Sequence, residues 1–253
     1  MKPGKVENYI TDKIAREGGL ILGVLDTGKV TENAPEISAK TAEEAGVDIL
    51  LMGGSTGVHM EELNETIKRI KENCSLPVVI FPGNVVLTNK ADAVFFMNLI
   101  NSGDNYWNST VQILGSVVAK KMNLESIPTG LVILEPGMTV GWITNARLVP
   151  RSKPELAAAS ALACEYTGSR LVILESGSGA PEPASKETIA AVRKTISIPF
   201  FYGGGIRTPE QAYTTINAGA DGVFVGTAIE SGDMGDKLKS LVSAVKKAGK
   251  EKI

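Results

Sequence analysis

Three adjacent glycines, Gly203-Gly204-Gly205, form the stretch of this sequence with the clearest chemical potential. They follow the apolar run 198–201 (Ile-Pro-Phe-Phe) and precede Thr208-Pro209-Glu210, which is typical of a helix start. Glycine backbones reach positive φ and approach a ligand closely, and the free N–H groups at a helix N-terminus bind anions. Residues 222–227, Gly-Val-Phe-Val-Gly-Thr, repeat the pattern one strand later. We therefore predict a phosphate site built from two neighbouring turns.

A carboxylate is expected beside this phosphate site. Glu175 ends the apolar run 171–174 and is followed by Ser176-Gly177-Ser178-Gly179, a second flexible stretch of backbone N–H groups. Next to a bound phosphate, the carboxylate can orient or deprotonate a hydroxyl of a small phosphorylated substrate. The alternative is a structural ion pair with Arg151 or Lys153.

Asp26 is the best candidate for a metal ligand. It ends an apolar run, and Ser55 follows the next one, so the two side chains offer hard oxygen ligands that suit Mg²⁺. Alternatively, Asp26 caps the following loop or pairs with Lys29. The sequence has a single histidine and no His/Cys cluster, which argues against zinc and redox iron.

Other polar residues have simpler interpretations. Arg207 either assists the phosphate or points outward to solvent, and Glu135 precedes a Pro-Gly pair that can simply turn the chain. His59 precedes a helical pattern and is expected to be a loop or cap residue. Cys74 and Cys164 lie far apart and are expected to be reduced packing residues.

Eight short apolar runs alternate with helical patterns, which is typical of βα units. In 253 residues, eight units predict one phosphate-binding (β/α)₈ TIM-barrel domain, with chemistry at the carboxyl ends of its strands. The predicted strands are 20–26, 48–53, 78–82, 93–98, 130–135, 170–175, 199–203 and 222–226. The predicted helices are 5–17, 32–45, 61–73, 106–122, 153–166, 185–195, 209–218 and 235–248.

The third unit is too short. Only residues 83–92 separate its strand from the next one, which leaves no room for a full outer helix and two loops. The missing helix is either a deletion covered by the preceding helix or a groove for a long apolar ligand that runs off the top of the barrel.

The composition excludes some function classes. With a net charge of −2, the chain has no basic field for nucleic acid. It shows neither a signal segment nor about 18 consecutive apolar residues, so we expect a cytoplasmic protein, with peripheral membrane contact left open.

Taken together, the motifs resemble those of the geranylgeranylglyceryl phosphate synthase family, archaeal-type prenyltransferases. The likeness covers nearly the whole chain, from Leu20 to Ala228. The matching stretches are 81–84, 91–97, 135–142, 154–157, 174–183 and 203–207.

The resemblance implies transfer of a geranylgeranyl group from geranylgeranyl diphosphate to the 3-hydroxyl of sn-glycerol 1-phosphate, with Mg²⁺ assistance. It places the metal on Asp26 and Ser55, catalysis on Glu175 and Asp26, and the prenyl chain beside the short third unit. It also implies a homo-oligomer. The glycerol phosphate site falls on Ile173, Leu174, Glu175, Ser176, Gly177, Ser178, Gly179, Gly204, Gly205, Gly226 and Thr227.

Two positions depart from the family pattern. The family usually has a second acid two residues after the position of Asp26, where this chain has Gly28, and a tyrosine where this chain has Ile173. Three alternatives stay open: a same-family synthase for another prenyl length, such as heptaprenyl; a sugar-phosphate enzyme of amino-acid biosynthesis; and a barrel that binds phosphorylated metabolites without turnover.

Overall fold

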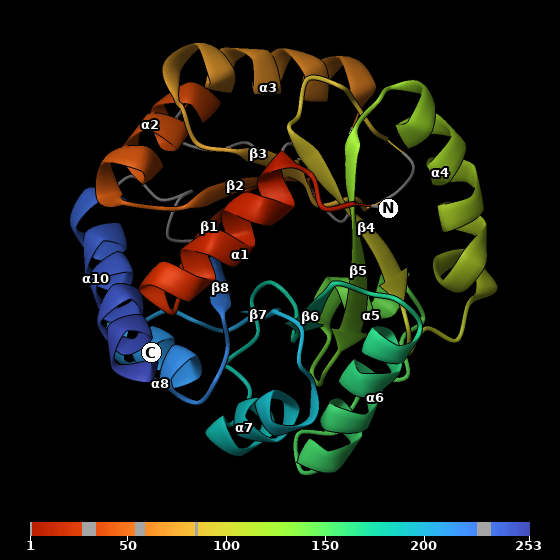
Figure 1. The fold of residues 1–253 in the computed structure, drawn as a ribbon, viewed down its shortest axis with the longest axis vertical. Helices are drawn as coiled ribbons and strands as arrows, with labels where there is room; N and C mark the ends of the chain where they lie inside the picture. Colours follow the sequence, from red (N-terminus) through yellow and green to blue (C-terminus); the bar gives the residue numbers. More distant parts are fainter. Residues whose placement is uncertain (1, 27–33, 54–58, 84–85, 227–233) are drawn as a thin grey trace.

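Eight parallel strands close into a barrel in chain order, as predicted (Figure 1). The computed structural model describes residues 2–26, 34–53, 59–83, 86–226 and 234–253. The strands are β1 (Leu20–Asp26), β2 (Ile49–Gly53), β3 (Val78–Ile80), β4 (Ala93–Leu99), β5 (Glu125–Ile133), β6 (Leu171–Glu175), β7 (Phe200–Gly203) and β8 (Gly222–Val225). Strand β8 pairs with β1, so the sheet has no free edge.

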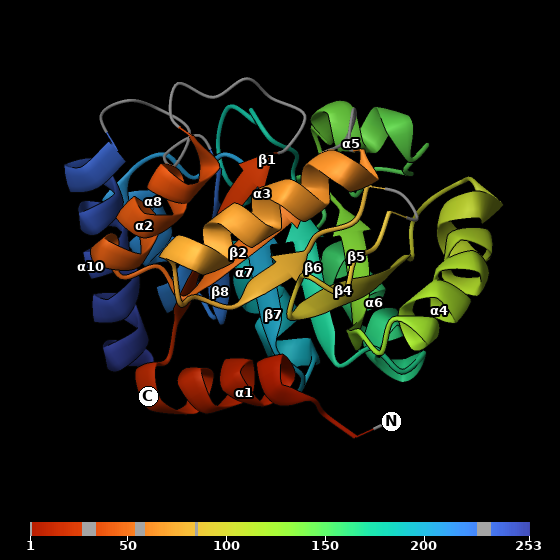
Figure 2. The same ribbon diagram turned by 90° about the horizontal axis from the view of Figure 1, so that it is seen from above.

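Helices surround the barrel, and α1 lies across the end opposite α5 (Figure 2). The helices are α1 (Lys5–Glu17), α2 (Pro35–Ala45), α3 (Met60–Asn73), α4 (Val111–Lys121), α5 (Met138–Ile143), α6 (Pro154–Tyr166), α7 (Lys186–Thr195), α8 (Pro209–Asn217) and α10 (Met234–Lys252). A π-helical turn, η1 (Tyr106–Thr110), leads into α4. No helix in these ranges is long and apolar enough to cross a bilayer.

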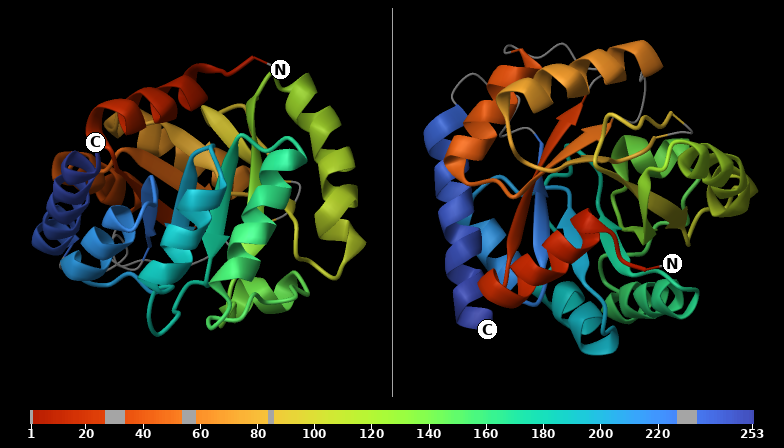
Figure 3. Two further views of the ribbon diagram at one scale, coloured as in Figure 1. Left: turned by 60° about the horizontal axis from the view of Figure 1, so that its bottom comes forward. Right: turned by 45° about the horizontal axis from the view of Figure 1, so that its top comes forward.

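The strands separate two hydrophobic cores. Alternate residues point inward and outward, so Leu20 and Leu22 fill the barrel while Ile21 packs under the helices. Figure 3 shows from two further directions that the helices surround the strands. Four phenylalanine rings meet edge to face or tilted inside the barrel: Phe81, Phe95, Phe201 and Phe224.

The third outer helix is absent from the described part of the third unit, which confirms the prediction. Between β3 and β4, residues 81–83 and 86–92 contain no helix. The register Val79–Ala93 places the two strands side by side without one. The barrel wall is therefore thinner between α3 and α4 (Figure 1).

The prediction placed the start of one strand wrongly and missed one helix. Strand β5 begins at Glu125 and not at Gly130, because residues 125–131 pair with all of β4. Pro128 hid this start, although its carbonyl accepts a hydrogen bond from the Arg170 N–H of the neighbouring strand's entry. The short helix α5 was not predicted at all.

Candidate active site at the carboxyl end of the barrel

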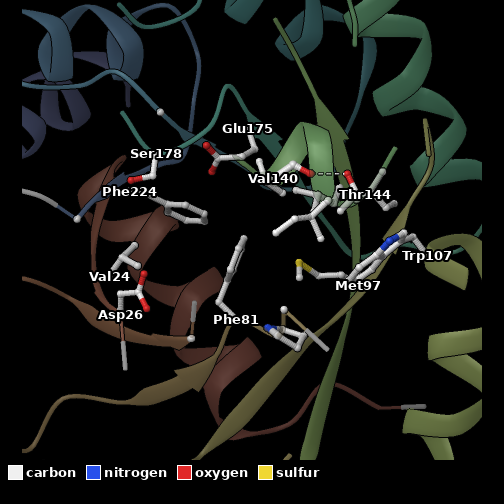
Figure 4. A pocket seen from close by; sticks show the side chains of 18 of the residues that line it. Val24, Asp26, Phe81, Met97, Trp107, Val140, Thr144, Glu175, Ser178 and Phe224 are labelled. Carbon is white, nitrogen blue, oxygen red and sulfur yellow. Dashed lines mark hydrogen bonds between the residues drawn. The ribbon is translucent and has the colours of Figure 1, made fainter. Parts of the chain in front are cut away.

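A cavity of about 220 Å³ opens at the carboxyl ends of the strands. One end is polar and is lined by Asp26, Glu175, Ser178 and the turns at Gly204-Gly205 and Gly226. The other end is apolar and runs toward η1 and α4 (Figure 4). Most of the predicted glycerol phosphate residues that the structure describes thus lie at or beside one end of one cavity.

Glu175 is a buried carboxylate with which no cation among the described residues pairs. It is 9% exposed, and one oxygen accepts a hydrogen bond of 2.6 Å from the Gly177 N–H. Arg151 pairs with Glu182 and Lys153 with Glu155, so the predicted alternative of a structural ion pair is wrong. Burial raises the pKa of Glu175 to about 7, although the Gly177 N–H opposes this shift. The group can therefore exchange a proton near neutral pH.

The first glycine of the triple turn makes room for this carboxylate. A Cβ on Gly203 would lie 2.2 Å from the second oxygen of Glu175, so a side chain there would displace the acid. Gly204 and Gly205 have φ of +99° and +76°, and both line the cavity. The turn therefore serves two purposes, close packing on Glu175 and exposure of backbone to the cavity.

The residues around Glu175 take different positions. Ser178 and Gly179 line the cavity, whereas the Ser176 hydroxyl accepts a hydrogen bond from Tyr202 on the outer side of the barrel. Ile173 is fully buried inside the barrel, and Leu174 is fully buried under the helices. Neither side chain faces the cavity.

Asp26 lies on another wall of the cavity than Glu175, next to Val24 (Figure 4). Its predicted partner Ser55 lies outside the described residues, as does Thr227. In the described ranges no three His, Cys, Asp or Glu residues cluster as ligands. One carboxylate, that of Asp26, still fits Mg²⁺, which keeps several waters and is completed by substrate phosphates.

The apolar end leaves the barrel through the wall where the third helix is missing. Met97 and Leu99 belong to the inner face of β4, while Val94 and Phe96 belong to its outer face, and all four line the cavity. The cavity therefore extends across β4 from the inside to the outside of the barrel. This geometry supports the groove interpretation of the short third unit.

Sequence reasoning missed the outer wall of this groove. Trp107, Val111 and Gly115 line it at a spacing of four residues, which is the signal that the sequence offered for one helix face. Gln112 fixes that wall, because its amide donates to the Met97 carbonyl (2.8 Å) and the Trp107 carbonyl (2.7 Å).

The remaining candidates have structural contacts. Arg207 is exposed and donates to the Pro181 carbonyl (2.6 Å) and more weakly to Gly179, so it braces the loop after β6. Glu135 accepts a hydrogen bond from the Arg151 N–H (3.0 Å). His59 occupies the N-cap position of α3, as predicted.

Both cysteines are buried and unpaired, as predicted. Burial raises the pKa of Cys164 to about 12. A thiol that stays protonated is inert as a nucleophile, which agrees with a packing role.

A closed parallel barrel with glycine turns and a buried carboxylate at the carboxyl ends of its strands is typical of phosphate-binding TIM barrels. The chain belongs to the PcrB family, whose model matches residues 21–246.

Curated relatives agree with this assignment. The chain is 47% identical over 235 residues to the geranylgeranylglyceryl phosphate synthase of Pyrococcus furiosus, covering 91% of this chain and 92% of that protein. It is 43% identical over 244 residues to the synthase of Methanothermobacter thermautotrophicus, covering 95% and 98%.

Solved structures agree as well. The chain matches the Thermoplasma acidophilum (S)-3-O-geranylgeranylglyceryl phosphate synthase, solved with sn-glycerol-1-phosphate, with a TM-score of 0.92 and 36% identity over 98% of this chain and 100% of that one. A tryptophan synthase alpha chain of Legionella pneumophila matches with a TM-score of 0.65 and 15% identity over 97% of each chain, which shows only that the fold is shared.

Proposed function

We propose that this protein transfers a geranylgeranyl group from geranylgeranyl diphosphate to the 3-hydroxyl of sn-glycerol 1-phosphate. The observation that carries the proposal is one cavity that joins a polar end at Glu175 to an apolar groove across β4. The names of the curated relatives and the sn-glycerol-1-phosphate in the Thermoplasma acidophilum structure support it. In the reaction, the glycerol oxygen bonds to the first prenyl carbon, and the bond from that carbon to diphosphate breaks.

The polar end suits the acceptor. The backbone around Gly204, Gly205 and Gly226 lines the cavity, where N–H groups can hold a phosphate. Glu175 then orients the glycerol hydroxyls and takes the proton of the attacking one, since its pKa lies near neutrality. Fixing both partners turns a bimolecular encounter into a positioned attack.

The apolar end suits the donor chain. Phe96, Met97 and Val111 offer hydrocarbon surface where the barrel wall is open. Burial of a chain stabilises the complex by about 0.8 kcal/mol per methylene. The groove therefore favours a long prenyl diphosphate over a short one.

Asp26 and Ser55 would hold Mg²⁺ at this site. The ion would supply charge that stabilises the departing diphosphate. Replacing Asp26 by Asn is expected to raise the Mg²⁺ concentration for half-maximal activity at least about tenfold, since removing one ligand weakens the site. A Mg²⁺ titration of initial rates measures this, and an unchanged midpoint would contradict the assigned ligand.

Self-association and membrane contact are also part of the proposal. Large apolar side chains are exposed on α4 and α5, among them Ile113, Val117 and Trp142, the last at 85%. Such a surface supports assembly of a homo-oligomer. We also propose that the protein is cytoplasmic. Light scattering gives the subunit number, and co-sedimentation with vesicles tests peripheral contact.

One assay separates this function from its alternatives. The protein is incubated with sn-glycerol 1-phosphate, Mg²⁺ and prenyl diphosphates of 10 to 35 carbons, about two to seven isoprene units. A maximum in ether product at geranylgeranyl supports the proposal. A maximum at heptaprenyl makes the protein a synthase for a longer chain, and binding without product makes it a non-catalytic barrel.

A further inference from the structure

Tyr202 is a buried polar side chain that does not touch the cavity. It belongs to β7, is fully buried and packs in the outer core between the barrel and the helices. Its phenol oxygen accepts a hydrogen bond from the Ala184 N–H (2.7 Å) and donates one to the Ser176 hydroxyl (2.9 Å). The directions are consistent, because a backbone N–H can only donate and the phenol proton is then free for Ser176.

These two bonds hold both ends of one loop. Ser176 is the first residue after β6, and Ala184 directly precedes Ser185, the N-cap of α7. The loop between them contributes Ser178 and Gly179 to the polar end of the cavity and the Gly177 N–H to Glu175. A single phenol oxygen thus fixes the segment that faces the acceptor.

Two arginines brace the same loop from the solvent side. Arg207 donates to the Pro181 and Gly179 carbonyls, and Arg151 donates to the Pro183 carbonyl (2.6 Å). Arg207 is exposed and Arg151 is 33% exposed, so water competes for both contacts. The phenol contacts are shielded from water, and a buried donor that loses its partner has none to replace it.

The phenol also keeps its proton. Burial raises the pKa of Tyr202 to about 12, although its hydrogen bonds with Ser176 and Ala184 oppose that shift. Tyr202 therefore remains a hydrogen-bond donor wherever the protein is folded and active.

We propose that Tyr202 is a positioning residue for the acceptor: its phenol sets the conformation of the loop 176–184 and thereby the affinity for the phosphorylated glycerol. This inference rests on the proposed function. Tyr202 acts through Ser176 and Ala184 and touches neither substrate nor reacting atoms. The prenyl groove lies on the other side of the barrel mouth and should not sense the change (Figure 4).

The test compares two Tyr→Phe variants. Tyr202→Phe removes the buried hydroxyl and keeps the ring, while Tyr213→Phe removes an exposed hydroxyl that bonds to Glu251 on α10. We expect Tyr202→Phe to raise the KM for sn-glycerol 1-phosphate about tenfold, with the KM for geranylgeranyl diphosphate changed less than about twofold. Tyr213→Phe is expected to leave both constants unchanged.

A second variant decides the matter if Tyr202→Phe folds poorly. Ser176→Ala keeps the phenol bonded to Ala184 and cuts only the link to the end of β6. We expect it to raise the same KM about threefold or more, and Tyr202→Phe to add less in the Ser176→Ala background than in the wild type.

Three results would overturn the inference. A lower melting temperature for Tyr202→Phe with an unchanged acceptor KM would make the residue structural only. Equal changes in both KM values would mean a general distortion of the site. If the wild type itself neither forms ether product nor melts higher with sn-glycerol 1-phosphate, the proposed function fails and this inference fails with it.

Discussion

Buried carboxylates occur at both ends of the barrel, but the groups that contact them differ. At the end covered by α1, Asp48 pairs with Lys13 and Lys246 at 2.7 Å each. Asp221 pairs there with Arg193 and Lys252 at 2.8 Å, and Glu7 pairs with Arg170 at 2.5 Å. At the other end, Glu175 accepts a hydrogen bond from the Gly177 N–H, and no cation in the described part of the chain pairs with it.

The paired acids at the α1 end stabilise the fold, whereas Glu175 at the other end is suited to catalysis. The paired acids at the α1 end also bind the first residues of strands: Asp48 accepts a hydrogen bond from the Ile21 N–H, and Asp221 accepts one from the Phe200 N–H. No cation among the described residues compensates the charge of Glu175, and burial raises the pKa of this carboxyl to about 7. An acid held in this way destabilises the fold when ionised but can take a proton from a substrate. In TIM barrels the carboxyl end of the strands carries catalysis.

The largest effect is expected from Glu175→Gln. The amide keeps the shape but cannot take a proton, so kcat should fall about 10²–10⁴-fold. The fold should be stabilised above pH 7, by about 3 kcal/mol at most, because the variant has no buried charge. Product assays and melting curves measure the two effects.

The raised pKa of Glu175 determines how the difference in stability between the wild type and Glu175→Gln changes with pH. Below pH 4.5 the carboxyl is protonated in the folded and unfolded chain, so wild type and variant should be equally stable. Between pH 4.5 and about 7 the unfolded chain loses the proton first, and the wild type loses stability as pH rises. A Glu175→Gln protein that is less stable than the wild type at pH 8 would contradict the assignment.

The matching substitution at the α1 end, Asp48→Asn, should lower the stability of the fold and leave the kinetics unchanged. It leaves Lys13 and Lys246 with Glu17 as their remaining acid partner. We expect a loss of about 3 kcal/mol in the free energy of unfolding, since one partner of a buried pair is removed. Both KM values should stay unchanged at 25 °C. Urea denaturation and steady-state kinetics measure this, and a changed KM with normal stability would break the comparison.

The sequence predicted the barrel because each strand is a short apolar run bounded by turns, and β1 was predicted at its observed limits, Leu20–Asp26. It also placed Glu175 at the mouth, because the residue ends an apolar run. It could not show that no cation among the described residues pairs with Glu175, since that depends on Arg151 pairing with Glu182 in the loop that follows β6. Helix α5 was missed because six residues after a Pro-Gly pair carry too little periodicity.

The sequence predicted the opening of the groove but not its outer wall. A short link between two strands indicates a missing helix, but not what faces the opening. Its outer wall comes from α4, and only the packing of that helix against β4 brings Gly115 opposite Phe96. The four-residue spacing of Trp107, Val111 and Gly115 indicates one helix face, but what that face packs against depends on tertiary structure.

The smallest effect is expected in the groove itself. A Cβ on Gly115 would lie 3.7 Å from the Phe96 ring, so Gly115→Ala fits and should stabilise α4 by about 1 kcal/mol without altering kinetics. Gly115→Phe would place a ring in the groove. We expect kcat/KM for geranylgeranyl diphosphate to fall about tenfold, with less loss for a ten-carbon prenyl diphosphate that needs less of the groove.

The acceptor provides the internal control for that experiment. Gly115 lines only the apolar end, so the KM for sn-glycerol 1-phosphate should stay the same in Gly115→Phe, whereas Tyr202→Phe should change only that constant. Opposite patterns in the two variants would show that the two ends of the cavity bind their ligands independently. A prenyl-length profile in Gly115→Phe that equals that of Gly115→Ala would place the donor chain elsewhere, because a ring cannot enter an occupied groove without excluding part of its occupant.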